Sequence, residues 1–198
     1  PRVGGVGGRV LRYGSGRRYL LVSKHNDIGK VLENGFVLGN FDIPTPGPIE
    51  VDSLRGCNMS FRRDVLIRVG GFDENFKVNC FREETDVCLR VRRAGYKLIY
   101  HPRALVWHKY KGSILDRRKL YWTFYNHTYF FFKNFQPVGP LKALRFLRGA
   151  LLPPRDYMMK STVKTRLDPL ALALALKGML DGFRTYRELY SRPRTLSH

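Results

Sequence analysis

The sequence predicts an α/β domain followed by a basic helical segment. Apolar residues at Val87, Val91 and Ala94 follow the i, i+4, i+7 spacing of one helix face, and Gly95 is a typical residue just past a helix end. Two short apolar runs, 97–100 and 104–107, come directly after this helix and have the length of strands. This alternation of helix and strand indicates the fold class.

Composition favours a packed globular protein. The chain has 198 residues, of which 43% are hydrophobic and 13% aromatic, and these fractions exclude the disordered class. It begins at Pro1 and reaches a strand-like run, 6–11, almost at once, so we expect a fragment whose upstream part is missing. No apolar run approaches the roughly 20 residues that span a bilayer.

Charge is concentrated in the second half of the chain. There are 36 Lys and Arg against 16 Asp and Glu, a net charge of +20. Residues 109–198 carry 18 basic and 5 acidic side chains, whereas residues 1–108 carry 18 and 11. A basic tail of this kind suits an anionic partner, either phospholipid head groups or nucleic acid.

The first fifty residues carry little chemistry. Four glycines in the first eight residues lack both the Gly-x-Gly-x-x-Gly and the Gly-Lys-Ser/Thr spacing, so we interpret them as part of a strand and not as a phosphate loop. A further strand is expected at 19–22, a turn at Asn34-Gly35 and a loop at 45–48. The cysteines Cys57, Cys80 and Cys88 lack metal-ligand spacing and predict reduced thiols in an intracellular protein.

The central part, residues 56–108, contains the candidate chemistry. Residues 62–69 predict a helix with Val65, Leu66 and Val69 on its buried side and Gly70 as its stop. Glu83, Glu84 and Asp86 lie at the start of the next predicted helix, where the macrodipole favours negative charge. They are either first-turn acids that pair with neighbouring arginines or catalytic carboxylates that meet His108 at the end of the following strand.

Three interpretations remain open for the aromatic run 121–132: a helix packed on the domain, a membrane interface, or a nucleic-acid surface. Basic residues at every third position among the leucines of 138–152 predict an amphipathic helix, either on an anionic membrane or packed on the protein. Asp168-Pro169 predicts the start of the last helix, and Gly178 and Gly182 would allow close helix contact.

Several pieces of the central part occur in an ordered series: GCNMSFRR at 56–63, GGFDE at 70–74, EETD at 83–86 with CLR at 88–90, AGY at 94–96 and VWH at 106–108. This series closely resembles the C-terminal half of the catalytic domain of family-two glycosyltransferases, the inverting enzymes of GT-A fold. The resemblance implies a partial GT-A fold with a mixed sheet, followed by amphipathic helices.

The resemblance also implies roles for individual residues. The family's catalytic base falls on Glu84, where glutamate replaces the usual aspartate. Asp86 is the next candidate for a catalytic residue, followed by Glu83, which directly precedes Glu84. His108 resembles a histidine that binds manganese or magnesium together with an Asp-x-Asp motif, which this chain lacks. The substrate pocket would be lined by Gly56, Asn58, Asp73, Glu74 and Trp107.

We therefore expect residues 1–135 to be the acceptor-side part of a glycosyltransferase domain and residues 136–198 a basic, membrane-associating tail. The resemblance implies a nucleotide-sugar donor, a lipid-linked or cell-surface glycan acceptor, a role in cell-envelope polysaccharide synthesis, and a peripheral location on the cytoplasmic face of the membrane. We expect the fragment alone to be inactive. The alternatives are a basic module that binds nucleic acid or another polyanion, and a homologue that binds sugar without turnover.

Overall fold

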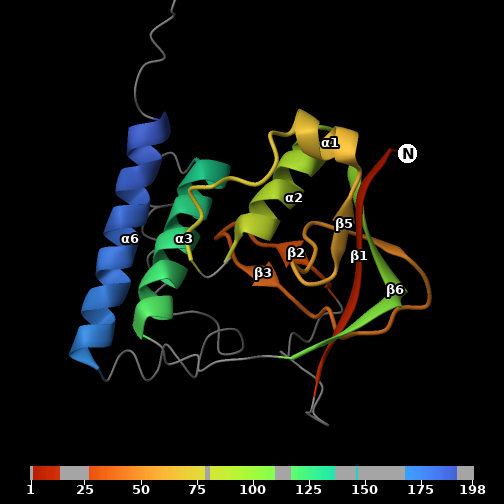
Figure 1. Cartoon of the computed structure of the whole chain (residues 1–198), viewed down its shortest axis with the longest axis horizontal. Helices are drawn as coiled ribbons and strands as arrows, with labels where there is room; N and C mark the ends of the chain where they lie inside the picture. Colours follow the sequence, from red (N-terminus) through yellow and green to blue (C-terminus); the bar gives the residue numbers. More distant parts are fainter. Residues whose placement is uncertain are drawn as a thin grey trace, which may run out of the picture.

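The computed structural model describes residues 2–13, 27–78, 81–109, 117–136, 146 and 168–190. Its main sheet has four strands in the order β4-β6-β1-β5 (Figure 1). Strands β1 (Val3–Arg12) and β6 (Lys97–His108) are parallel neighbours at its centre. Strands β4 (Ile49–Val51) and β5 (Met59–Phe61) pair antiparallel with β6 and β1. The α/β class and the mixed sheet are therefore confirmed.

The glycines of β1 allow other elements to approach its backbone closely. A Cβ added at Gly4 would lie 2.7 Å from the Cβ of Tyr96 and 2.8 Å from Cγ1 of Val91. At Gly8 a Cβ would overlap the carbonyl oxygen of Ala104. The interpretation of this segment as a strand is confirmed, because larger residues would separate β1 from α2 and β6.

The two runs predicted at 97–100 and 104–107 are parts of one strand. Within β6 the pairing with β1 shifts, so that Gly8 pairs with His101 but Arg9 pairs with Leu105. The Nδ2 of Asn58 donates hydrogen bonds to the carbonyl oxygens of Arg9 (3.0 Å) and Ala104 (2.8 Å) at this shift. The irregularity thus interrupts the sequence pattern without ending the strand.

Helices α1 (Arg63–Arg68) and α2 (Glu83–Arg93) form where the sequence predicts them. Both are followed by glycines with positive φ, +81° at Gly70 and +86° at Gly95. Ala94 is exposed, contrary to the predicted stripe, because α2 ends at Arg93. The core between the helices and the sheet contains Val65, Val87, Val91, Leu98 and Tyr100, all fully buried.

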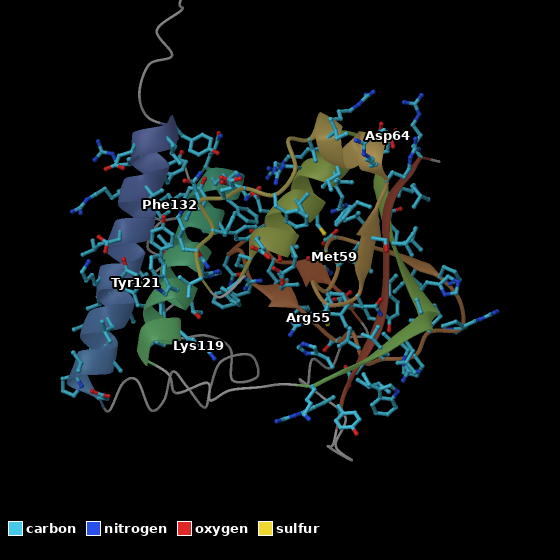
Figure 2. All side chains as sticks on the ribbon, viewed as in Figure 1. Arg55, Met59, Asp64, Lys119, Tyr121 and Phe132 are labelled. Carbon is cyan, nitrogen blue, oxygen red and sulfur yellow. The ribbon has the colours of Figure 1, made fainter. Side chains whose placement is uncertain are left out.

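Helix α3 (Arg117–Phe135) lies between α2 and α6 (Pro169–Tyr190), as Figure 1 shows. Its aromatic side chains are mostly buried, including Phe124, Tyr129, Phe130 and Phe131. Tyr121 and Phe132 reach toward α6 (Figure 2), where the ring of Phe132 lies 4.6 Å from that of Phe183. Of the three interpretations of run 121–132, the packed helix is confirmed.

Helix α6 starts as predicted, with the Oδ1 of Asp168 accepting hydrogen bonds from the backbone N–H groups of Leu170 (3.0 Å) and Ala171 (3.3 Å). A Cβ at Gly178 or Gly182 would overlap the carbonyl oxygen of Tyr121 or Tyr125 on α3. The predicted close contact of helices is therefore confirmed, and α3 and α6 touch at their backbones.

Other expectations have different outcomes. The Asn34-Gly35 turn is confirmed between the short strands β2 (Lys30–Val31) and β3 (Val37–Leu38), with φ of +80° at Gly35. The strand at 19–22, Cys80 and the helix at 138–152 lie outside the described residues, apart from Phe146, whose ring stacks 4.2 Å from Phe131. The boundary at 135/136 stays a prediction. None of the described helices has the length and apolar character to cross a membrane.

Gly182→Ala should lower the free energy of unfolding, because the added methyl group forces α3 and α6 apart. Overpacking of this kind costs about 1–3 kcal/mol, more than the roughly 1 kcal/mol that alanine gains over glycine within a helix. Urea unfolding would measure the difference. Gly47→Ala is the control, since a Cβ there has no atom within 4 Å. A Gly182→Ala variant as stable as the parent would contradict the close contact.

Candidate active site around Glu84

A buried arginine holds the start of α2. Arg82, the residue before the helix, has a left-handed backbone (φ +76°) and is 2% exposed. Its guanidinium carbon lies 4.7 Å from the ring centroid of Phe81, and its Nε donates a hydrogen bond of 3.3 Å to the Nδ1 of His127. Burial, with the nearby Arg82 charge, holds the pKa of His127 well below its usual range, so the ring is neutral and can accept.

Glu84 lies in the first turn of α2, against the turn that contains Gly56. A Cβ built on Gly56 would lie 3.9 Å from the Cβ of Glu84 and 4.0 Å from its carboxyl carbon. No side chain at position 56 therefore stands between this turn and the carboxyl group. The structure brings together two residues that the sequence analysis placed at the site.

The carboxyl group of Glu84 is poorly satisfied. Its Oε2 is buried, and no group among the described residues donates a hydrogen bond to it. Burial raises the pKa of Glu84, although its own backbone N–H and the charges of Arg55 and Arg82 oppose the shift. A carboxylate in such a place gains by accepting a proton, which is the property that a general base requires.

Asp86, two residues further along the same helix, has the opposite environment. Its side chain is fully buried, and its Oδ2 accepts hydrogen bonds of 2.9 Å from both Arg90 Nε and Lys133 Nζ. Its Oδ1 accepts a hydrogen bond of 2.8 Å from Asn134. Both oxygens are used to join α2 to α3, whereas Glu84 keeps an oxygen without a hydrogen-bond donor among the described residues.

Asp73 belongs to the same buried network. Its Oδ2 accepts hydrogen bonds from Lys133 Nζ (2.6 Å) and the Tyr129 hydroxyl (2.7 Å), and its Oδ1 accepts from the backbone N–H of Asn75 (2.9 Å). The Lys133 ammonium therefore bridges Asp73 and Asp86. Asp73 fixes the loop before α2 to α3, and its predicted contact with substrate stays a prediction.

The other predicted site residues are spread over the domain. The amide nitrogen of Asn58 donates hydrogen bonds to backbone carbonyl oxygens of β1 and β6. Glu83 is half-buried beside Glu84, and Glu74 is exposed on the loop before α2. Trp107 is 61% exposed on β6, so it does not fill the core.

His108 is the last residue of β6, where its carbonyl oxygen accepts a hydrogen bond of 3.0 Å from the N–H of Tyr13. The predicted site residue Asn58 contacts β6 at Ala104, and His108 lies four residues further along the strand, about 13 Å away. Within the described ranges, no three His, Cys, Asp or Glu side chains gather closely enough to bind a metal ion. These residues do not by themselves form a metal centre.

Sequence reasoning missed Arg55 and Lys133 as residues that shape the site. It expected Arg82 and Arg90 to pair with the acids; Arg90 does pair with Asp86, whereas the Nε of Arg82 donates its hydrogen bond to His127. Lys133 is 47 residues from Asp86 and carries no local signal.

Comparison with known proteins gives a partial relative. Over 65 residues the chain is 38% identical to a glucosyl-dolichyl phosphate glucuronosyltransferase of Haloferax volcanii. The match covers 30% of this chain and 21% of the relative, so the chain spans about a fifth of the length of that protein. No family model matches the chain. The match supports the prediction of a glycosyltransferase.

Asp73→Asn should destabilise the protein at neutral pH. Burial pushes the pKa of Asp73 upward, but hydrogen bonds from Lys133, Asn75 and Tyr129 outweigh it and lower the pKa from 3.8 to about 2. The carboxylate therefore contributes stability above its ordinary pKa, and this contribution is lost as the pH falls through the lowered value. The shift corresponds to about 2–3 kcal/mol at neutral pH.

Urea unfolding of Asp73→Asn between neutral pH and pH 2 would measure this dependence, with the gap to the parent narrowing in acid. Asp64→Asn is the control, because Asp64 pairs with Arg62 on the surface and its side chain is 62% exposed. Such pairs contribute little. A gap that does not change with pH would contradict the ionic role of Asp73.

Glu84→Gln should raise the melting temperature at neutral and alkaline pH. Because the pKa of Glu84 is raised by burial, the stability that its protonated form provides is lost as the pH rises through that pKa. Glutamine keeps the shape without the buried charge. Thermal unfolding at several pH values would show the gain, which should vanish in acid.

Glu83→Gln is the matched control, since it removes the same charge from the same helix turn. A similar pH-dependent gain in Glu83→Gln would show that the effect comes from overall charge and not from the burial of Glu84.

Proposed function

We propose that this chain is the acceptor-side part of an inverting glycosyltransferase of family two and GT-A fold. It would transfer a sugar from a nucleotide-sugar donor to a lipid-linked or glycan acceptor, with Glu84 as the catalytic base. The observation that carries the proposal is the Glu84 carboxyl group at the start of α2 beside Gly56, whose Oε2 is buried and has no hydrogen-bond donor among the described residues.

Two further observations support it. The motifs of residues 56–108 resemble the family in order and spacing. The partial relative is named as a glucuronosyltransferase that acts on glucosyl-dolichyl phosphate, a sugar attached to a lipid phosphate. This relation supports a lipid-linked acceptor as part of the proposal. A peripheral position on the cytoplasmic face of a membrane is a further part of the proposal and rests on the resemblance of the sequence.

The reaction that Glu84 would serve is a single displacement. The Glu84 carboxylate accepts the proton of the acceptor hydroxyl, and the acceptor oxygen forms a bond to the anomeric carbon. The bond between that carbon and the diphosphate oxygen breaks, and its electron pair leaves with the nucleoside diphosphate. A base with a pKa above the ordinary carboxylate value binds the transferred proton better, and base catalysis of this kind contributes about 10²–10⁴-fold.

A manganese or magnesium ion is part of the proposed reaction. When bound, such an ion neutralises charge on the leaving diphosphate. From the described residues it would have His108 as a ligand, and its other ligands would be carboxylate and phosphate oxygens.

The alternatives receive less support from the structure. A nucleic-acid module based on the aromatic run 121–132 would need those rings at the surface, but Phe124, Tyr129, Phe130 and Phe131 are buried. A homologue that binds sugar without turnover would tolerate changes at Glu84, which an enzyme would not.

In the full-length protein, Glu84→Gln should reduce nucleotide release from the correct nucleotide sugar by about 10²–10⁴-fold. Glu84→Asp should retain measurable activity, because aspartate keeps a carboxylate at this position on a side chain that is one methylene shorter. The assay would use a panel of nucleotide sugars, manganese or magnesium, and a lipid extract as acceptor. His108→Ala should weaken the dependence on metal concentration.

Equal activity of Glu84→Gln and the parent would remove Glu84 from the base role. Release from no donor at all would favour the homologue without turnover. Glu83→Gln serves as the control for loss of charge at the helix start.

A further inference from the structure

Beyond the four-stranded part of the sheet, β1 and β6 continue as a two-stranded ribbon. Strand β5 pairs with Gly5–Gly7 of β1, and β4 pairs with Leu98–Tyr100 of β6. From Arg9 to Arg12 and from Leu105 to His108, the two strands pair with each other alone among the described strands. The backbone N–H of Val10 donates a hydrogen bond of 2.9 Å to the carbonyl oxygen of Phe41, so the loop before β4 supports the β1 edge of the ribbon. The exposed face of the ribbon is a candidate for contact with another surface.

One face of this ribbon is apolar and exposed. Leu105 is 42% exposed, and Trp107 and Tyr13 are each 61% exposed. Trp107 pairs in register with Leu11, and alternation along the strands puts Leu105, Trp107, Leu11 and Tyr13 on the same side. Arg9 pairs with Leu105 and shares this side, where its Nε and Nη2 donate hydrogen bonds to the carbonyl oxygen of Asp42. The Nζ of Lys109 lies 5.9 Å from the ring centroid of Tyr13. We name Leu11, Tyr13, Leu105, Trp107 and Lys109 the ribbon face.

The charged residues next to the ribbon face in sequence are all basic. Residues 9–13 and 103–109 contain four Lys or Arg and no Asp or Glu, whereas Lys97, at the far end of β6, pairs with Glu50. Arg12 and Arg103, which neighbour the ribbon face in sequence, are exposed, and so is Lys109, which belongs to it. Positive charge around apolar and aromatic side chains is complementary to an anionic surface that has an apolar layer beneath it.

We propose that the ribbon face docks on the surface of an anionic lipid membrane. Trp107 and Tyr13 would lie at the level of the head groups, where amphipathic rings are favoured. Leu105 and Leu11 would reach the boundary of the acyl chains, and the flanking cations would contact lipid phosphates. The inference rests on the membrane contact of the proposed function and assigns it a surface, but its test requires no catalysis.

The chemistry of the ribbon face favours lipid over other anionic partners. Nucleic-acid surfaces use aromatic rings as stacking platforms, and the two leucines offer no π-face to a base. A second copy of the chain would bring the same cations together in a two-fold interface, which opposes association.

The test compares vesicle binding of two double variants of the whole chain with the same change in charge. Leu105→Glu with Lys109→Glu alters the ribbon face. Ile67→Glu with Arg68→Glu alters exposed residues of α1, at the opposite end of the sheet (Figure 1), where Ile67 is 63% exposed. The vesicles are pure phosphatidylcholine, or phosphatidylcholine mixed with phosphatidylglycerol. Thermal unfolding checks that both variants fold.

The parent should bind the mixed vesicles and not the neutral ones. The ribbon variant should bind at least about tenfold more weakly, and the α1 variant should stay within about twofold of the parent. Equal losses in the two variants would show attraction by net charge alone and would overturn the proposal. Loss of binding to a single-stranded RNA oligonucleotide with no loss to vesicles, or a dimer that only the ribbon variant disrupts, would also overturn it.

A second measurement leaves the ribbon face unchanged. The chain has two tryptophans, so in a Trp122→Phe background the emission comes from Trp107. On mixed vesicles the emission should shift to shorter wavelength and become protected from acrylamide. Unchanged emission from vesicle-bound protein would place the contact elsewhere. Because neither measurement uses a nucleotide sugar, membrane docking and glycosyl transfer can fail independently.

Discussion

The Lys133 ammonium, held between Asp73 and Asp86, is the interaction on which the arrangement of the site depends. It joins α3 to the first turn of α2 and to the loop that precedes it, with distances of 2.6 and 2.9 Å. Removing charges from water is costly unless each is paired and hydrogen-bonded. Arg90 and Asn134 complete the pairing at Asp86, so the network fixes the orientation of the helix start. Helix α3 therefore holds the first turn of α2 in place, and α6 packs against α3 on its other side.

This network separates two acids that the sequence cannot rank from local pattern alone. Asp86 receives hydrogen bonds at both oxygens and holds the helix, whereas Glu84 faces the Gly56 turn with its Oε2 unsatisfied within the described part of the chain. Opposite environments suit neighbouring carboxylates to different roles: Asp86 holds the helix, and Glu84 is the acid that we propose as the base. The buried pair of Arg82 and His127 anchors the residue before the helix.

Features with a local signal could be predicted from the sequence. Gly70 and Gly95 mark helix ends, Asp168-Pro169 marks a helix start, and Gly178 and Gly182 mark the contact of α6 with α3. Features that depend on distant contacts could not. The hydrogen bond from Asn58 to the carbonyl oxygen of Ala104 lies where the pairing register of β6 with β1 shifts, so β6 continues although its apolar pattern is interrupted. Lys133 on α3 donates hydrogen bonds to Asp73 and Asp86, which lie on the loop before α2 and on α2. Motif spacing selected Glu84, but the exposure of Trp107 depends on where β4 and β5 stop pairing.

The most direct measurement is the pKa of Glu84 itself, from the carboxyl carbon shift in a ¹³C NMR titration of the whole chain, assigned with Glu84→Gln. Burial without a donor to Oε2 raises this pKa above its ordinary value of 4.5, so we expect the midpoint to lie above that value. A midpoint at or below 4.5 would mean that the carboxylate is solvated or paired. Such a result would contradict its assignment as a base made reactive by its surroundings.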